Sequence, residues 1–187
     1  MIELKNINGG YGKKQVLFDI NTIMHKNEIT SIIGPNGCGK STLLEISSGL
    51  MKPYEGVVVA DGVNIHEMNA KDRAKKISVL SQQKNPGALT VRALVYHGRF
   101  PYLGYPRKYR DEDRKIVDEA MRTAGIYDLA EESLSELSGG QQQKAYIAML
   151  LAQNTDIVFL DEPVTFLDIN YQLELMEIIK ELKNNGK

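Results

Sequence analysis

Residues 34–42 read GPNGCGKST and fit the spacing G-x-x-x-x-G-K-[ST]. Glycine permits positive φ and a close approach of the main chain to an anion, so the backbone N–H groups of such a loop can cradle phosphates. We expect Lys40 to reach the β- and γ-phosphates of a nucleotide and to act in catalysis, and the hydroxyl of Ser41 to hold Mg²⁺. The predicted nucleotide-binding residues here are Gly34, Pro35, Asn36, Gly37, Cys38, Gly39, Lys40, Ser41 and Thr42.

Two adjacent carboxylates, Asp161 and Glu162, follow residues 156–160, DIVFL, an apolar run that suits a central parallel strand. Doubly wound sheets place ligands at the carboxyl ends of their strands. We expect Asp161 to support the Mg²⁺ shell opposite Ser41, directly or through water, and Glu162 to polarise the water that attacks the γ-phosphate. The alternative is an acidic pair that only solvates a loop, and the presence of the phosphate loop disfavours it.

A third group, LSGGQ at residues 137–141, stands at the start of a predicted helix. Its serine is placed to cap that helix, or to offer a hydroxyl and N–H groups to an anion. Taken alone, the string is also compatible with a plain Ser-Gly-Gly helix start. It resembles the signature of the ATP-binding-cassette (ABC) family, and that resemblance implies that the ATP-contacting residues include Ser138, Gly139, Gly140 and Gln141.

Three further resemblances to that family extend over most of the chain. Tyr11, in GGYGKKQVL, resembles the aromatic residue that stacks on adenine, with ordinary strand packing as the alternative. Gln82, in VLSQQ, resembles the glutamine that joins Mg²⁺ and the attacking water to the helical insertion. The adjacent Gln83 makes the register debatable, and the family spacing after the strand favours Gln82. Residues 163–168, PVTFLD, resemble the loop through which two subunits communicate, with Asp168 in the key acidic position, a place compatible with a helix cap.

The surrounding pattern predicts an α/β fold. Strands are expected over residues 2–7, 16–20, 28–33, 56–60, 77–81 and 156–160, and helices from about Lys40 and over 90–98, 111–124, 140–153 and 169–182. We therefore predict a phosphate-loop NTPase core of mostly parallel sheet with helices, an N-terminal antiparallel β part and an inserted helical subdomain. In this division, 1–187 is a single ABC ATPase domain, 1–84 and 154–187 form the α/β core, and 85–153 form the helical signature subdomain.

Composition restricts the function classes. The 187 residues carry a net charge of −1, so no strong basic field argues for wrapping nucleic acid. Aromatic and basic residues within 96–110 could stack on a nucleic acid, but the neutral charge favours a permease-facing or solvated surface, and we expect no nucleic-acid partner. No apolar stretch approaches the roughly 20 residues needed to span a bilayer. The single cysteine fits a reducing compartment, so we expect a cytoplasmic chain.

The resemblance also implies partners. In that family two ATPase subunits dimerise head to tail around ATP. On the inner face of the membrane, the closure of this dimer is coupled to an integral membrane permease. Residues 91–105 and 161–179 resemble the importer branch for iron-siderophore, haem and cobalamin, which works indirectly with a substrate-binding protein. The alternatives are a soluble ABC ATPase that remodels a protein or nucleic-acid complex, and a regulatory cassette that senses ATP without turnover.

One family feature is missing from the sequence. The family has a further strand ending in a histidine that contacts the γ-phosphate, whereas this sequence has no histidine between His97 and Lys187. We therefore expect a truncated piece of a longer protein. As it stands, the chain is expected to bind Mg-ATP but to hydrolyse it poorly.

Overall fold

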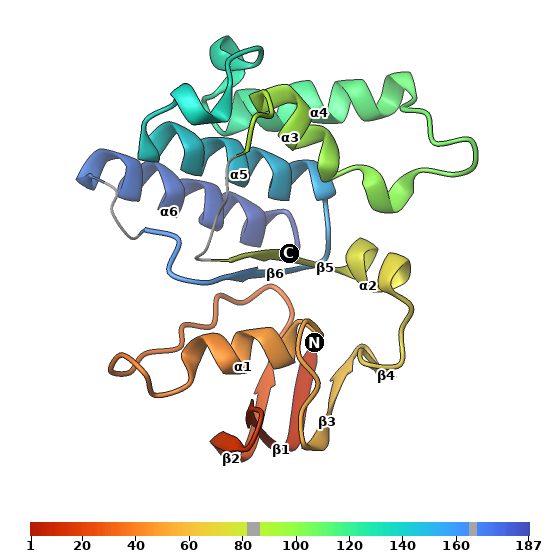
Figure 1. The fold of residues 1–187 in the computed structure, drawn as a ribbon, viewed down its shortest axis with the longest axis vertical. Coiled ribbons are helices and arrows are strands. Elements are labelled where there is room, and N and C mark those ends of the chain that lie inside the picture. The colour runs from red at the N-terminus through yellow and green to blue at the C-terminus, as the bar shows by residue number, and fades with distance from the viewer. Residues whose placement is uncertain (82–86, 165–167) are drawn as a thin grey trace. The chain divides into compact units, whose positions relative to one another are not determined.

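The computed structural model describes residues 1–81, 87–164 and 168–187. The chain divides into two compact units, one made of Met1–Arg73 with Lys183–Lys187 and the other of Ala74–Leu182. Each unit has a β-sheet and helices of its own (Figure 1). The predicted division into 1–84 with 154–187 and 85–153 stays a prediction.

The first unit contains a four-stranded antiparallel sheet in the order β2-β1-β3-β4. Its strands are β1 (Ile2–Tyr11), β2 (Lys14–Met24), β3 (Glu55–Ala60) and β4 (Val63–Asn64). Ile2 pairs with Met24 on one side and with Ala60 on the other, so β1 lies between β2 and β3. This sheet confirms the predicted N-terminal antiparallel part.

Helix α1 (Lys40–Ser47) packs on this sheet through a glycine in β1. A Cβ at Gly9 would lie 2.4 Å from Cδ1 of Ile46, so any larger residue at this position would force that side chain to shift. Ile46 is fully buried, together with Ile7 and Val58 of the sheet. Burial of these aliphatic side chains fixes the helix that follows the phosphate loop.

The strand predicted over residues 28–33 is wrong. These residues are outside every strand that the structure describes, and Ile33 is 92% exposed. A β-branched apolar run predicts a strand only where a neighbour supplies ladder hydrogen bonds, and no described strand pairs with this segment. The segment therefore leads into the phosphate loop without belonging to a described strand.

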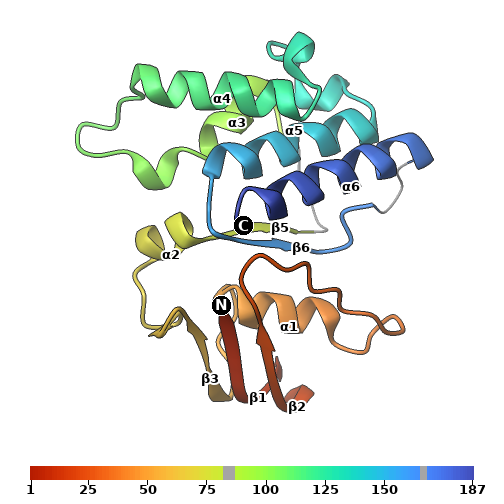
Figure 2. The same ribbon diagram turned by 180° about the vertical axis from the view of Figure 1, so that it is seen from behind.

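The second unit combines two parallel strands with the helices of the predicted insertion. Strands β5 (Ile77–Leu80) and β6 (Ile157–Leu160) pair in register from Ile77 with Ile157 to Leu80 with Leu160. Helices α5 (Gly139–Gln153) and α6 (Ile169–Asn184) lie over these strands, and α3 (Val91–His97) and α4 (Asp111–Thr123) lie on the far side of α5 (Figures 1 and 2). Helix α2 (Ala70–Lys76) leads into β5, and single 3₁₀ turns cover Phe100–Tyr102, Tyr127–Leu129 and Leu134–Glu136.

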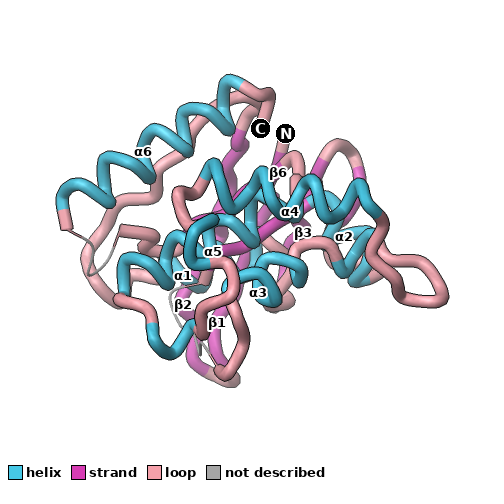
Figure 3. Tube along the Cα trace, turned by 90° about the horizontal axis from the view of Figure 1, so that it is seen from above, coloured by secondary structure: helices cyan, strands magenta, loops and turns pink. Residues whose placement is uncertain are grey.

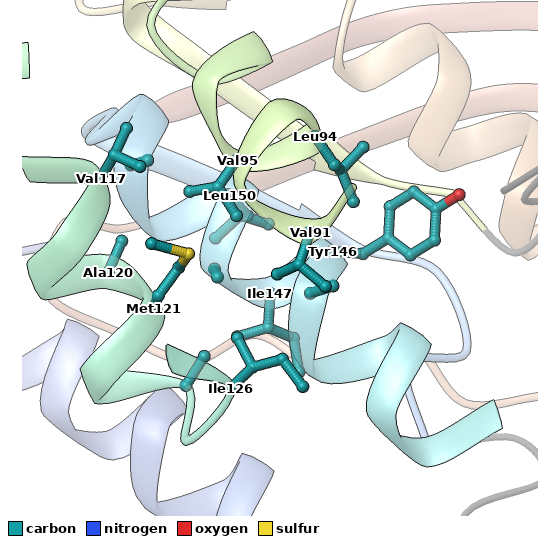
Figure 4. Close-up of a cluster of buried hydrophobic side chains, with 14 of the residues drawn as sticks. Val91, Leu94, Val95, Val117, Ala120, Met121, Ile126, Tyr146, Ile147 and Leu150 are labelled. Atoms are coloured by element: carbon teal, nitrogen blue, oxygen red, sulfur yellow. The ribbon is translucent and has the colours of Figure 1, made fainter. Parts of the chain in front are cut away.

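The core of this unit lies where α3, α4 and α5 meet. Figure 4 shows Val95, Met121 and Ile147 pointing toward one another from these helices. Val95 and Met121 are fully buried. The connection between α3 and α4 projects from the helices in Figures 1 and 3, and the ring of Tyr105 on it is completely exposed. The helices are thus held by apolar packing, while this connection stays on the surface.

Candidate nucleotide site

The phosphate loop has the backbone that its glycines predicted. Gly37 and Gly39 have φ of 80° and 100°, in the left-handed region that favours glycine. A Cβ at Gly39 would also lie 2.8 Å from Cγ1 of Val16, whereas the space around Gly37 is open. The loop from Gly34 to Cys38 is exposed. Its main chain is therefore accessible to an anion.

The ammonium group of Lys40 lies against this loop. Its Nζ donates to the carbonyl oxygens of Gly34 and Pro35, each at 3.0 Å. Lys40 is also the first residue of α1, so its charge and the helix N-terminus occupy the same end of the loop. Ser41 follows it within the helix. The arrangement presents one cation, a helix N-terminus and a hydroxyl residue together, as phosphate binding requires.

Tyr11 lies at the end of β1 and is tied to α1. Its hydroxyl donates to a carboxylate oxygen of Glu45 at 3.0 Å, and the hydroxyl of Thr42 donates to the Tyr11 hydroxyl at 3.5 Å. The residue is 52% exposed. These bonds hold the aromatic ring close to the helix that follows the phosphate loop. Stacking on adenine stays a prediction.

The two carboxylates follow β6 as the sequence predicts. The N–H of Asp161 donates to the carbonyl of Leu80 at 2.9 Å, so the parallel ladder extends to Asp161. Glu162 has φ of 45°, an unfavourable conformation for a residue with a side chain. Such conformations concentrate at functional sites, where the surrounding structure maintains them. The predicted role of Gln82 falls on a residue outside the described part of the chain.

Ser138 caps α5, as one of the two interpretations of LSGGQ predicted. Its hydroxyl accepts from the N–H of Gln141 at 3.3 Å, and the N–H of Ser138 donates to the side chain of Gln141 at 2.9 Å. The two residues form a reciprocal capping box, which the spacing S-x-x-Q could have revealed. Contact of this motif with ATP stays a prediction.

Asp168 caps the next helix, α6. Its carboxylate oxygen Oδ1 accepts from the N–H groups of Asn170 and Tyr171, at 2.9 and 3.1 Å. The helix-capping role that the sequence analysis allowed for Asp168 is therefore confirmed. Of the predicted communication loop, residues 165–167 lie outside the described chain.

Gln143 is a site residue that the sequence analysis missed. It is buried on α5, and its side-chain amide donates to the carbonyl of Pro163 at 2.6 Å. Pro163 follows Glu162, so the helix that starts at the LSGGQ string is bonded to the segment after the carboxylates. No spacing rule singles out this glutamine, because its partner is a main-chain carbonyl 20 residues away.

The phosphate loop, Lys40 and Tyr11 lie together in the first unit, whereas Asp161, Glu162, Ser138 and Asp168 lie in the second. Within the described ranges, no helix is both long and apolar enough to cross a membrane. The same residues contain no group of three or more His, Cys, Asp or Glu side chains that could hold a metal ion by themselves. The hydroxyl of Ser41 is a hard oxygen donor of the kind that Mg²⁺ prefers.

Comparison with known proteins agrees with this site. Residues 17–165 match the ABC transporter family. Over 180 residues the chain is 43% identical to the iron(3+)-hydroxamate import ATP-binding protein FhuC of Bacillus subtilis (strain 168), covering 95% of this chain and 67% of the relative. It is 47% identical over 174 residues to the ferric enterobactin transport ATP-binding protein FepC of Escherichia coli (strain K12), covering 92% of this chain and 64% of that relative.

The fold matches as well. The chain superimposes with a TM-score of 0.88 and 34% identity on a bacterial ABC transporter cassette solved as a dimer, covering all of this chain and 85% of that one. The chain therefore belongs to the ABC transporter family and has the ABC cassette fold, as the sequence predicted. It spans about two thirds of the length of the two relatives above.

Proposed function

We propose that this chain is the ATP-binding and ATP-hydrolysing part of an ABC importer for iron-siderophore or a related metal chelate such as haem or cobalamin. The observation that carries the proposal is the phosphate loop, in which Lys40 lies against the exposed carbonyls of Gly34 and Pro35 at the start of α1. The identities of 43% and 47% to ATP-binding proteins of iron-hydroxamate and enterobactin transport support the substrate class.

The residues divide the chemistry among them. Backbone N–H groups of the loop and Lys40 bind the phosphates and favour the charge that develops during phosphoryl transfer. Glu162 accepts a proton from the attacking water, oriented with the help of Gln82. Mg²⁺, when bound by Ser41 and Asp161 and linked to Gln82, neutralises phosphate charge. The ring of Tyr11 stacks on adenine.

The nucleotide also assembles the protein. A second, identical ATPase subunit supplies Ser138, Gly139, Gly140 and Gln141 to the ATP bound by the first, with Asp168 at the subunit contact. ATP then favours the closed pair, and loss of the γ-phosphate releases it, which is a two-state switch biased by a ligand. The subunits work on the cytoplasmic face of the membrane against permease subunits, which in turn receive the chelate from a substrate-binding protein.

ATP turnover by the full-length protein tests the enzymatic part. We expect Lys40→Ala to weaken Mg-ATP binding and Glu162→Gln to retain binding but lose hydrolysis, because the two residues serve different steps. Lys115→Ala, which removes an exposed lysine of α4, is the matched control and should change neither. Hydrolysis that survives Glu162→Gln would contradict the role of Glu162, and a folded protein that binds no ATP would contradict the whole site.

The chain 1–187 should bind Mg-ATP with the affinity of the full-length protein but turn it over much more slowly. The terminal histidine that the family uses at the γ-phosphate is not in this sequence. Equal turnover numbers for the two proteins would show that residues 1–187 contain the complete hydrolytic set.

Purification from native membranes tests the transport part. The tagged full-length protein is extracted in detergent, and mass spectrometry identifies the proteins that accompany it. A polytopic permease among them supports the importer. If only soluble proteins co-purify, and the Lys40→Ala variant used as the control co-purifies with the same proteins, the result would instead favour a remodelling ATPase.

A further inference from the structure

Gly140 of the LSGGQ string packs against Tyr171, the third residue of α6. A Cβ at Gly140 would lie 3.0, 3.1 and 3.3 Å from the Cε2, Cδ2 and Cζ atoms of that ring. Gly140 is within α5 and is not among the glycines with positive φ, so its backbone conformation does not require glycine. A side chain at Gly140 would instead crowd the tyrosine ring, which would have to shift by a few tenths of an ångström to admit it. Gly139, by contrast, has open space where its Cβ would be.

Lys144 fastens the same ring from one turn further along α5. Its Nζ lies 4.7 Å from the centre of the Tyr171 ring, which is within the range of a cation–π interaction. The same Nζ is 2.7 Å from a carboxylate oxygen of Glu174, the residue one turn after Tyr171 on α6. The Lys144 side chain is only 19% exposed, while that of Glu174 is 55% exposed. One lysine therefore contacts two consecutive turns of α6.

These contacts connect two motifs of the nucleotide site. Tyr171 is in the first turn of α6, and its own N–H is bonded to the Oδ1 of Asp168. Gly140 is two residues after the capping Ser138. A continuous series of contacts thus runs from the start of α5, through the Tyr171 ring, to the cap of α6, and all of it lies in the second unit. The helices themselves run alongside one another in Figures 1 and 2.

We propose that Tyr171, held by Lys144 and Glu174, is a positioning residue that fixes the LSGGQ turn relative to Asp168. This inference rests on the function proposed above, in which both segments face a second subunit across ATP. The Tyr171 ring belongs to the first turn of α6 and packs against the first turn of α5. Because interiors pack closely, this contact favours one placement of the two helix starts relative to each other. Removing the ring leaves the Lys144–Glu174 contact but lets the LSGGQ turn and the cap of α6 shift relative to one another, so the surface that meets the second subunit loses its fixed shape. The phosphate loop of the same chain is unaffected.

The test measures ATP-dependent dimerisation of the full-length protein carrying Glu162→Gln, so that bound ATP is not consumed. In sedimentation experiments with saturating Mg-ATP, Tyr171→Ala is expected to raise the dimer Kd by about tenfold, the size of a typical coupling between residues in contact. Tyr171→Phe retains the ring and should stay within about twofold of the parent. The affinity of the monomer for a fluorescent ATP analogue should be the same in all three proteins.

The outcomes separate the two proposals. A Tyr171→Ala protein that dimerises like the parent overturns the positioning role, and so does a loss of monomer ATP affinity equal to the loss of dimerisation. A parent that binds no ATP, or that binds it and stays monomeric, refutes the proposed function, and the positioning role with it.

A second measurement covers the case in which Tyr171→Ala unfolds. Gly140→Ala should lower the urea midpoint of the full-length protein in the presence of the ring and should do so less in a Tyr171→Leu background, where the smaller side chain leaves room. Gly139→Ala, with open space around it, is the control and should have the same effect in both backgrounds. Additive effects for Gly140→Ala would contradict the contact on which the proposal stands.

Discussion

Asp113→Asn tests a buried ion pair that joins three helices. Arg99 and Asp113 are 6% and 7% exposed, and the Nε of Arg99 is 2.9 Å from Oδ1 of Asp113. The other carboxylate oxygen, Oδ2, accepts from the N–H of Arg110 at 3.0 Å. The guanidinium also donates to the carbonyl of Ala152, at 2.8 Å, and lies 3.9 Å from the centre of the Tyr102 ring. The pair therefore links the segment after α3 to the start of α4 and the end of α5.

The loss of stability expected for Asp113→Asn follows from this geometry. Asn has the shape of Asp, but it offers one acceptor where both carboxylate oxygens of Asp113 accept. Its NH₂ group would face a donor, and the guanidinium of Arg99 would stay buried without an opposite charge. Removal of one partner from a buried pair costs about 3–5 kcal/mol. The double change Arg99→Met with Asp113→Asn leaves no unpaired charge and should cost only about 1–2 kcal/mol, for the hydrogen bonds lost.

Urea unfolding followed by far-UV circular dichroism measures both changes. The control is Asp111→Asn, two residues away, whose carboxylate is 92% exposed and 3.7 Å from Arg114. An exposed pair of this kind contributes at most about 1 kcal/mol. The reasoning is refuted if Asp113→Asn destabilises the protein no more than Asp111→Asn, or if the double variant is less stable than the single one.

The same pair gives a pH dependence. Burial alone would raise the pKa of Asp113, but the N–H of Arg110 and the guanidinium of Arg99 outweigh it and hold that pKa below the ordinary value of 3.8. Because the folded pKa is depressed, the stabilisation is present above pH 3.8 and is lost as the pH falls through the folded pKa. Asp113→Asn should flatten this part of the stability profile.

Three other predictions concern single side chains. Burial lowers the pKa of His66 from 6.5, despite its bond to the carbonyl of Ile46, so stability should fall as the pH drops below 6.5, and His66→Gln should remove that slope in urea titrations. The buried hydroxyl of Ser47 has no hydrogen-bond partner among the described residues, so Ser47→Ala should raise the free energy of unfolding by about 1 kcal/mol. Ser48→Ala removes a hydrogen bond to the carbonyl of Glu45 and should lower the free energy of unfolding by about 1 kcal/mol. Changes of the same sign in the two alanine variants would contradict the prediction for Ser47. Glu162→Gly should relieve a φ of 45° and raise stability by about 1 kcal/mol while abolishing ATP turnover, whereas Glu162→Ala should lose turnover without that gain.

Local chemistry explains why much of the site could be predicted from the sequence. The phosphate loop depends on residues within one stretch of nine, and the caps at Ser138 and Asp168 depend on residues three positions apart, so spacing alone describes them. The three longer antiparallel strands and the helices of the insertion were likewise found from their periodicity, with boundaries that shifted by a few residues, whereas the two-residue strand β4 was not predicted. Helix α5, for example, starts at Gly139 rather than Gly140.

Contacts between distant segments could not be predicted in the same way. Residues 28–33 have the composition of a strand, but a strand also needs a partner, and composition contains no information on the partner. The bond from Gln143 to Pro163 and the contact of Gly140 with Tyr171 join positions 20 and 31 residues apart. Their strength depends on how α5 and α6 pack, which no single-sequence pattern specifies.

The two glycines of the LSGGQ string show what a motif conceals. Sequence reasoning gives both the same role, a main chain open to an anion, yet neither has positive φ. At Gly139 the space left by the missing side chain is open and the residue is exposed, so it remains accessible from outside. At Gly140 the same space is filled from within by the ring of Tyr171. A methyl group at Gly139 would therefore project into open space, whereas one at Gly140 would press on the Tyr171 ring, so the two glycines of one motif differ in what surrounds them.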